Sequence, residues 1–176
     1  CGNGDAEFEA LIAAVDRVQQ QLCAKVRAGR NYPELHLEAH RQLAGVLAEQ
    51  DIVRMSPEAM VAEAVTSTFF PHGLGHDLGL RVHDVNDRTQ PLAPGRIVTS
   101  EPGIYVRAVD VRAHSAYLAL PEAERAGVDA ALAKYADIGV RIEDDILVTT
   151  NTPTNLSAGA PRTVAEIEAW MAGDTP

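Results

Sequence analysis

Three histidines and two glutamates in this 176-residue chain have the residue types and spacing of a metal site. The histidines occur within one short, glycine-rich segment, and the glutamates follow on two later segments. Carboxylate oxygens suit Mg, Ca and Mn, whereas imidazole suits Zn, Fe and related ions. The sequence therefore predicts a divalent-metal site assembled from several segments. The five residues are His72, His76, His83, Glu101 and Glu143.

Taken singly, each of these residues has an ordinary structural explanation. A histidine in a loop is more often a surface or satisfied core group than a ligand, and His72 and His83 would then be turn histidines bonded to backbone. Arg141 and Glu143 would be a surface ion pair, which contributes about 0–1 kcal/mol to stability. The residue types alone leave both explanations open.

The order and context of the motifs are more specific. His-Gly-Leu-Gly-His at 72–76, Val-His-Asp at 82–84, Ser-Glu-Pro-Gly-Ile-Tyr at 100–105 and Val-Arg-Ile-Glu-Asp-Asp at 140–145 follow one another along the chain. Together they resemble the pita-bread metallopeptidases, a family that includes Xaa-Pro dipeptidases (prolidases), aminopeptidase P and methionine aminopeptidase. The proline-specific branch is the most similar, and the resemblance covers about the whole chain.

The resemblance implies a dinuclear site in which His76, Glu101 and Glu143 are metal ligands and Glu143 bridges the two ions. The implied cofactor is a pair of divalent metal ions, with manganese first and zinc or cobalt as alternatives. The implied reaction is two-metal hydrolysis of an Xaa-Pro peptide, the substrate partner of the site.

The resemblance also implies roles around the metals. Glu101 would accept a proton from the attacking water and return it to the leaving nitrogen. His72 and His83 would contact the substrate, one near the carbonyl and the other near the proline. Arg141 would hold the bridging carboxylate in place or bind the carboxylate of the substrate, since a guanidinium suits bidentate recognition.

Two aspartate ligands of the family have no counterpart in this sequence. They come from a hairpin that would fall upstream of Cys1, and Asp5 lies too late, at the entry of the first helix. We therefore expect residues 1–176 to be the C-terminal portion of the catalytic pita-bread domain, without that hairpin and without a separate N-terminal domain. Such a portion would bind metal weakly, be inactive alone and pair with the missing N-terminal half, and the intact protein would be a homodimer.

Alternative functions remain open within the same fold. An aminopeptidase P-type Xaa-Pro aminopeptidase shares these motifs, although the Phe-x-Pro-His-Gly-x-Gly-His pattern at 69–76 favours a dipeptidase. A metal-free module that binds peptides or proteins is a second alternative, and a creatinase-like, metal-independent hydrolase is a third. Retention of His76, Glu101 and Glu143 favours an enzyme over the binding module, and a creatinase-like hydrolase would not need the full set of glutamates.

Charge, hydropathy and cysteine content indicate which binding partners and which cellular compartment to expect. The formal net charge of −10 argues against nucleic-acid and anionic-membrane binding. No apolar run is long enough to span a bilayer, and we expect no signal peptide. Cys1 and Cys23 form no disulfide framework, and Cys23 lies in an apolar helical pattern, which predicts a buried thiol. These features together favour a cytoplasmic location.

Helices are expected in the first third of the chain. Apolar residues recur at spacings of three and four over residues 7–28, and Gly29 is the stop. A second helix is expected from Asn31, with a capping-box-like entry that uses Glu34. Ser56 is expected to open a third, short helix by the same logic.

The C-terminal part should also be partly helical. Residues 108–137 contain alanine-rich, helix-prone stretches, and a capping box from Thr163 to Glu166 starts a final helix. The residues of this helix expected to face inward are Ile167, Trp170 and Met171.

Strands are expected between these helical regions. Residues 69–84 read as irregular or strand-like, and residues 96–101 as a strand after which the chain turns away at Pro102, leaving Glu101 at an edge. Residues 140–149 read as one continuous strand. Helices and strands mix without a βαβ rhythm, so the predicted class is α+β. The resemblance implies the pita-bread (creatinase/aminopeptidase) fold, with a curved antiparallel sheet and outer helices.

Overall fold

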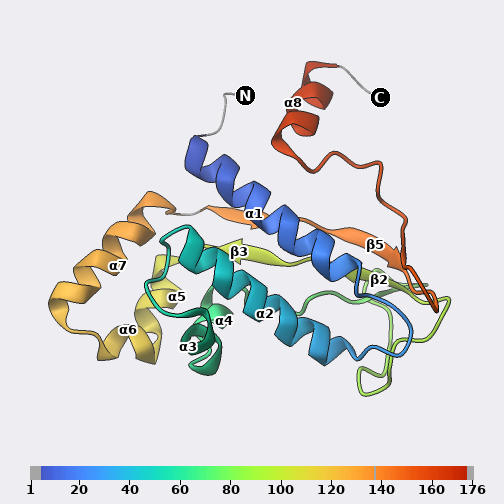
Figure 1. The fold of residues 1–176 in the computed structure, drawn as a ribbon, viewed down its shortest axis with the longest axis horizontal. Helices are drawn as coiled ribbons and strands as arrows, with labels where there is room; N and C mark the ends of the chain where they lie inside the picture. The colour runs from blue at the N-terminus through green and yellow to red at the C-terminus, as the bar shows by residue number, and fades with distance from the viewer. Residues whose placement is uncertain (1–4, 137, 174–176) are drawn as a thin grey trace.

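Two long helices lie across a sheet in this protein, which we describe from a computed structural model. The structure describes residues 5–136 and 138–173. Helices α1 (Ala6–Cys23) and α2 (Tyr32–Glu49) run antiparallel in front of the strands (Figure 1). Their apolar faces close the core, with Leu11 and Leu43 among the fully buried side chains. This layering places the strand ends, and the residues that they carry, under a helical cover.

The strands form two antiparallel sheets. The larger sheet has the order β1-β2-β5-β6, and the smaller sheet pairs β3 with β4. The strands are β1 (Asp77–Leu78), β2 (Ile97–Ser100), β3 (Gly103–Tyr105), β4 (Gly139–Arg141), β5 (Asp144–Leu147) and β6 (Thr154–Asn155).

The two sheets share one interrupted ladder. Ser100 pairs with Asp144 on one side of the interruption, and Gly103 pairs with Arg141 on the other. The register is the same on both sides, so residues 101 and 102 lie opposite residues 143 and 142. Pro102 has no backbone N–H to donate, which explains why regular pairing stops there. The prediction of one continuous strand over 140–149 is therefore wrong, because Ile142 and Glu143 separate β4 from β5.

The expected turn after Glu101 is also wrong. The chain continues through Pro102 into β3 in the same register, and Glu101 is 8% exposed rather than at an open edge. The short strand expected over 96–101 is confirmed as β2. The irregular or strand-like character expected over 69–84 is confirmed, with β1 as the strand, except at Phe69, which is the last residue of the helix Thr66–Phe69.

The first helix is shorter than expected. It ends at Cys23 rather than near residue 28, because the amides of Lys25 and Val26 bond only three residues back. The amides of Ala28 and Gly29 then bond the carbonyls of Thr149 and Leu92 in other segments. Competition from these tertiary hydrogen bonds ends the helix early. Of the apolar side chains expected on its buried face, Phe8 and Ile12 are partly buried and the others are buried: Leu11, Val15, Val18, Leu22 and Val26.

The next two helices begin where expected but are capped differently. Asn31 is the N-cap of α2 without a side-chain capping bond; its side-chain amide instead donates to the Glu34 carboxylate at 3.2 Å. The expected capping box is therefore wrong there. Ser56 does cap α3 (Pro57–Ala62), since its hydroxyl accepts a bond from the Ala59 amide.

Shorter helices fill the middle of the chain. The helix-prone stretch 108–137 is confirmed as three helices, although Asp137 lies outside the described residues. They gather with α3 and α4 at one end of the molecule (Figure 1). The additional helices are α4 (Thr66–Phe69), α5 (Ala108–Ala113), α6 (Ser115–Ala119) and α7 (Glu122–Lys134).

The final helix, α8 (Val164–Ala172), confirms its capping box and contradicts its predicted inward face. The Thr163 hydroxyl and the Glu166 carboxylate make the two reciprocal bonds of the box. Trp170 and Met171 are 57% and 55% exposed, and Ile167 is 36% exposed. The helix lies apart from the layered core (Figure 1), so no described part of the chain covers this face.

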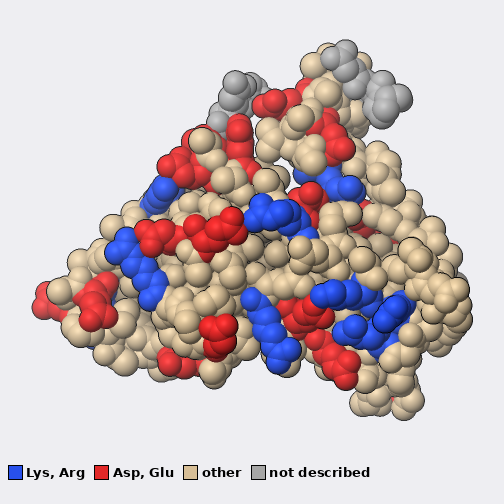
Figure 2. Space-filling model, viewed as in Figure 1, with Lys and Arg blue, Asp and Glu red and all other residues tan. Residues whose placement is uncertain are grey.

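Charges are mixed on the face that carries α1 and α2. Figure 2 shows acidic and basic side chains side by side there, as in the ion pairs Arg17–Glu49 and Arg30–Glu38. The excess of negative charge does not form one uninterrupted acidic patch on this face. Among the described residues, no helix is both long and apolar enough to cross a membrane.

A histidine pair on α2 lies beside α4, with His40 buried and His36 half-buried. His40 bonds the Thr66 hydroxyl through Nδ1 at 2.8 Å, and its Nε2 lies 3.2 Å from Nε2 of His36. Burial, together with the neighbouring His36, lowers the pKa of His40 from 6.5 to about 4. The folded state therefore holds this imidazole neutral at pH values where an exposed one would be charged.

We predict that His40 makes the protein less stable as the pH falls from about 6.5 to about 4. In that window the unfolded chain binds more protons at this group than the folded chain, so the free energy of unfolding decreases. The decrease attributable to this group should total about 1–3 kcal/mol. Urea unfolding at several pH values should show a shallower dependence for His40→Gln, whereas His114→Gln should keep the slope. Equal slopes for all three proteins would contradict the prediction.

Candidate metal centre

Three predicted ligands converge at the interruption of the ladder. One ligand atom each from His76, Glu101 and Glu143 lies within 4.8 Å of the other two. His76 directly precedes β1, Glu101 directly follows β2, and Glu143 directly precedes β5. The same register that pairs β2 with β5 therefore brings the two glutamates opposite each other, with the imidazole beside them.

Hydrogen bonding orients the imidazole of His76. Its Nδ1 lies 3.1 Å from the carbonyl oxygen of Asp77, which can only accept, so Nδ1 carries the hydrogen. In the neutral ring the lone pair is then on Nε2, which lies 3.5 Å from Oε1 of Glu101. A metal-ligating histidine commonly donates its second nitrogen in this way, which fixes the ring.

Glu101 is held by backbone and side-chain bonds. Its amide donates to the Leu74 carbonyl at 2.7 Å, and its Oε1 accepts from the Thr99 hydroxyl at 3.0 Å. The same hydroxyl accepts from the His76 amide at 2.9 Å. Thr99 thus ties two of the three predicted ligands to each other.

Arg141 lies between the two carboxylates. Its Nη1 is 3.7 Å from Glu101 and its Nη2 is 3.8 Å from Glu143. Partial burial raises the pKa of Glu143, and the facing Glu101 charge raises it further, whereas Arg141 and His76 lower it. The guanidinium offsets part of the repulsion between the carboxylates.

This donor set fits a divalent cation. Two carboxylates and one imidazole supply hard oxygen ligands and one nitrogen, a set compatible with Mn or Zn. A cation among them would relieve the repulsion that raises the pKa of Glu143. The three groups come from one turn and one ladder, so they need no large rearrangement to face a common ion.

An open cavity of about 530 Å³ adjoins these residues. The ring of His83 packs edge-on against that of His76, with centroids 4.2 Å apart. The lining side chains combine imidazoles with two guanidiniums. The cavity is lined by His72, Gly73, Gly75, His76, His83, Asp84, Asn86, Arg88, Glu101 and Arg141.

His72 lies at the same cavity with both ring nitrogens engaged. Its Nδ1 is 2.8 Å from the Gly73 carbonyl, and its Nε2 is 2.8 Å from the Tyr105 hydroxyl. Burial raises the pKa of Tyr105, so the phenol stays protonated and donates to Nε2. Tyr105 must therefore move, or give up this bond, before Nε2 of His72 is free to contact a substrate.

The sequence patterns did not predict several residues that lie at the site. Thr99 and Tyr105 lie within or beside the Ser-Glu-Pro-Gly-Ile-Tyr motif, so the motif was a signal for them. Arg88 and Tyr32 had no such signal: the guanidinium of Arg88 lies 5.9 Å from the centre of the Tyr32 ring and donates to the Gly75 carbonyl at 3.2 Å. Only the fold brings Tyr32, on α2, against Arg88 and the Thr99 carbonyl.

Comparison with known proteins identifies the family. A family model described as metallopeptidase family M24 matches residues 1–150. The match covers most of the sequence, and the chain belongs to metallopeptidase family M24.

Two relatives of similar sequence are both Xaa-Pro dipeptidases. An Xaa-Pro dipeptidase from Xanthomonas campestris pv. campestris (strain 8004) is 39% identical over 86% of this chain. An Xaa-Pro dipeptidase from Stenotrophomonas maltophilia (strain K279a) is 39% identical over 89% of it. The chain spans only 38% and 39% of the length of these two relatives.

Solved structures show the same fold. Aminopeptidase PepP of Pseudomonas aeruginosa has a TM-score of 0.77 and 31% identity, covering 97% of this chain and 36% of that one. Zn-substituted E. coli aminopeptidase P in complex with product has a TM-score of 0.77 and 29% identity, covering 99% of this chain and 36% of that one. The predicted α+β class and pita-bread fold are confirmed, with this chain forming a portion of that fold.

Substitutions of Gly73 and Gly75 test the backbone path of the turn at residues 72–76. A Cβ at Gly75 would overlap the Thr99 carbonyl oxygen and the Tyr32 hydroxyl oxygen, whereas a Cβ at Gly73 would meet only Nη1 of Arg88, at 3.3 Å. We predict that Gly75→Ala lowers the free energy of unfolding by about 1–3 kcal/mol through overpacking, while Gly73→Ala changes it little. Urea denaturation of both variants measures this, and equal costs would contradict the described path of the 72–76 turn.

Proposed function

We propose that this chain supplies His76, Glu101 and Glu143 to the dinuclear metal site of an Xaa-Pro dipeptidase. The observation that carries the proposal is the convergence of these three ligand atoms within 4.8 Å at the interrupted ladder. Membership in family M24 and the two Xaa-Pro dipeptidase relatives support the reaction class.

The roles of the chain's own residues follow from their contacts. Glu143, opposite Glu101, would hold the metal ions together with it, and Arg141 offsets part of the repulsion between the two carboxylates. Oε2 of Glu101 faces Arg141, and Oε1 is hydrogen-bonded to Thr99. We assign Glu101 as the proton acceptor during attack and as the donor to the proline nitrogen afterwards. His72 and His83 flank the cavity where a peptide would lie.

Two divalent ions, when bound, supply an activated water nucleophile and polarise the scissile carbonyl. The proposed metal is manganese, with zinc or cobalt as alternatives. A dinuclear site needs more ligands than these three, so we propose that two aspartates from a segment outside these 176 residues complete it. On this account the chain alone binds metal weakly and does not hydrolyse peptides.

A chimera tests the proposal directly. In it, this chain replaces the matching 38% of the Xanthomonas campestris dipeptidase. We predict Mn-dependent hydrolysis of Ala-Pro by the chimera and loss of activity with EDTA. Glu143→Gln should weaken Mn²⁺ binding by about 10- to 100-fold, since it removes a charged ligand. Glu122→Gln, on exposed α7, is the matched control and should leave both properties unchanged.

If the chimera does not fold, Mn²⁺ binding to the unaltered chain tests the proposed ligands instead. Mn²⁺ titration followed by electron paramagnetic resonance should show weak binding that His76→Ala abolishes. A folded chimera that cleaves nothing, or activity that persists in the Glu143→Gln variant, would overturn the proposed function.

An aminopeptidase P-type activity is the second candidate, favoured by the structural neighbours. The substrates of the two activities differ on the C-terminal side of proline, because a dipeptide carries a free carboxylate there. Arg141 already faces two carboxylates, whereas no carboxylate of the described residues pairs with Arg88 within 4.0 Å. Arg88 is therefore the cavity guanidinium available to bind the carboxylate of a dipeptide.

We predict that Arg88→Gln in the chimera raises KM for Ala-Pro about 10- to 100-fold with a smaller effect on kcat, since a charge-assisted bond is worth about 1.5–3 kcal/mol. Arg81→Gln, in the same loop but outside the cavity lining, should behave like the unaltered protein. Steady-state kinetics on Ala-Pro and on Ala-Pro-Ala would distinguish the candidates. Preferential cleavage of the tripeptide, unaffected by Arg88→Gln, would favour the aminopeptidase.

A further inference from the structure

A buried carboxylate lies directly behind the proposed metal ligands. Asp144 is 3% exposed, follows Glu143 in the chain, and pairs across the ladder with Ser100, the residue before Glu101. Successive side chains of a strand point to opposite faces. Asp144 accordingly points away from Glu143, toward α1.

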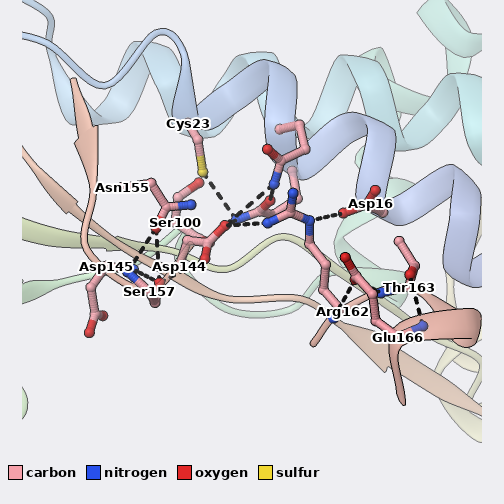
Figure 3. A network of polar contacts seen from close by, with 12 residues as sticks. Asp16, Cys23, Ser100, Asp144, Asp145, Asn155, Ser157, Arg162, Thr163 and Glu166 are labelled. Carbon is pink, nitrogen blue, oxygen red and sulfur yellow. Dashed lines mark hydrogen bonds and ion pairs between the residues drawn. The ribbon is translucent and has the colours of Figure 1, made fainter. Parts of the chain in front are cut away.

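Polar side chains surround Asp144 there, and Figure 3 shows Ser157 and Arg162 beside it. Its Oδ2 accepts from Nε2 of Gln19 at 2.8 Å, and its Oδ1 accepts from the Ser157 hydroxyl at 2.7 Å. Gln20 adds a longer bond of 3.4 Å, and Nη1 of Arg162 lies 4.0 Å from Oδ2. A carboxylate this deeply buried needs such hydrogen-bonding partners, because burial removes it from water.

Arg162 joins two elements at this point. Its Nε lies 3.1 Å from Oδ1 of Asp16 on α1, and its Nη1 approaches Asp144 on β5, with 28% of the side chain exposed. Its backbone is fixed as well, because its amide donates to the Glu166 carboxylate of the α8 capping box at 3.1 Å. The guanidinium is therefore held between a helix and a strand by its own segment (Figure 3).

Polar contacts dominate the attachment of the segment that provides Ser157 and Arg162. Helix α8 contributes no buried residue, and the segment lies beyond residues 1–150, which the family model matches. Besides its side-chain bond to Asp144, the Ser157 hydroxyl accepts from the Asp145 amide at 2.9 Å. These bonds concentrate on the first two residues of β5.

The location matters because the ladder is interrupted there. Ile142 and Glu143 lie outside regular pairing, so backbone hydrogen bonds alone do not fix the Glu143 backbone. We propose that residues 154–166 form a clamp that sets the direction of the Glu143 carboxylate by anchoring Asp144, and that Arg162 is its positioning residue. This inference rests on the proposed metal site, although the clamp itself can be measured without metal.

The test combines two readouts on the full chain. Mn²⁺ affinity, measured by electron paramagnetic resonance, should fall about tenfold in Arg162→Gln, as for other residues that orient metal ligands. Arg162→Lys should recover part of the loss by keeping the charge. Arg17→Gln removes an exposed arginine–glutamate pair between α1 and α2 and should leave the affinity unchanged.

Amide hydrogen exchange gives the second readout. In Arg162→Gln the amides of residues 142–146 should exchange faster, while those of α2 keep their protection. Unchanged Mn²⁺ affinity and unchanged exchange at 142–146, or exchange that is faster throughout the chain, would overturn the clamp. If the unaltered chain binds no Mn²⁺, the proposed metal site fails, and exchange at 142–146 alone decides for or against the clamp.

Discussion

A missing backbone donor at Pro102 determines the arrangement of the whole site. The ladder between the segments 97–105 and 139–147 stops there and resumes in the same register. Residues 101 and 143 therefore face each other at a place where no regular backbone bonds hold them. Two carboxylates brought this close repel each other, and the neighbouring Arg141 and His76 offset that repulsion. The metal assignment follows from this electrostatic constraint as much as from the residue types.

The two faces of the interrupted ladder carry different kinds of residue. The face toward the cavity carries the proposed ligands, and the face toward α1 carries Ser100 and Asp144 in a polar network with few water-accessible atoms. Burial raises the pKa of Cys23 on that side to about 12, so this thiol is a structural group rather than a nucleophile. Hydrogen bonds from Gln19 to the Ser100 carbonyl and to the Asp144 carboxylate connect α1 to the strands that carry the site. The proposed ligands on one face are thus backed by a buried polar network on the other.

Much of this arrangement could be predicted from the sequence, and the exceptions have physical causes. Local periodicity and capping chemistry predicted the buried face of α1, the Ser56 cap and the Thr163 capping box, because these depend on neighbours a few residues away. The convergence of His76, Glu101 and Glu143 was expected only through the family resemblance, since the spacing alone does not show which strands pair. The early end of α1 and the exposed face of α8 depend on tertiary partners that no local pattern encodes. Arg88 lacked a motif altogether.

On the proposed function, His76, Glu101 and Glu143 are all ligands of a single dinuclear metal site. The most direct test is a crystal structure of the chimera grown with Mn²⁺, with anomalous diffraction recorded at the manganese edge. The account predicts anomalous peaks within about 2.0–2.4 Å of Nε2 of His76 and of carboxylate oxygens of both glutamates, the range for such ligands. A peak elsewhere, with these three side chains free of metal in a crystal that is saturated with Mn²⁺, would contradict it.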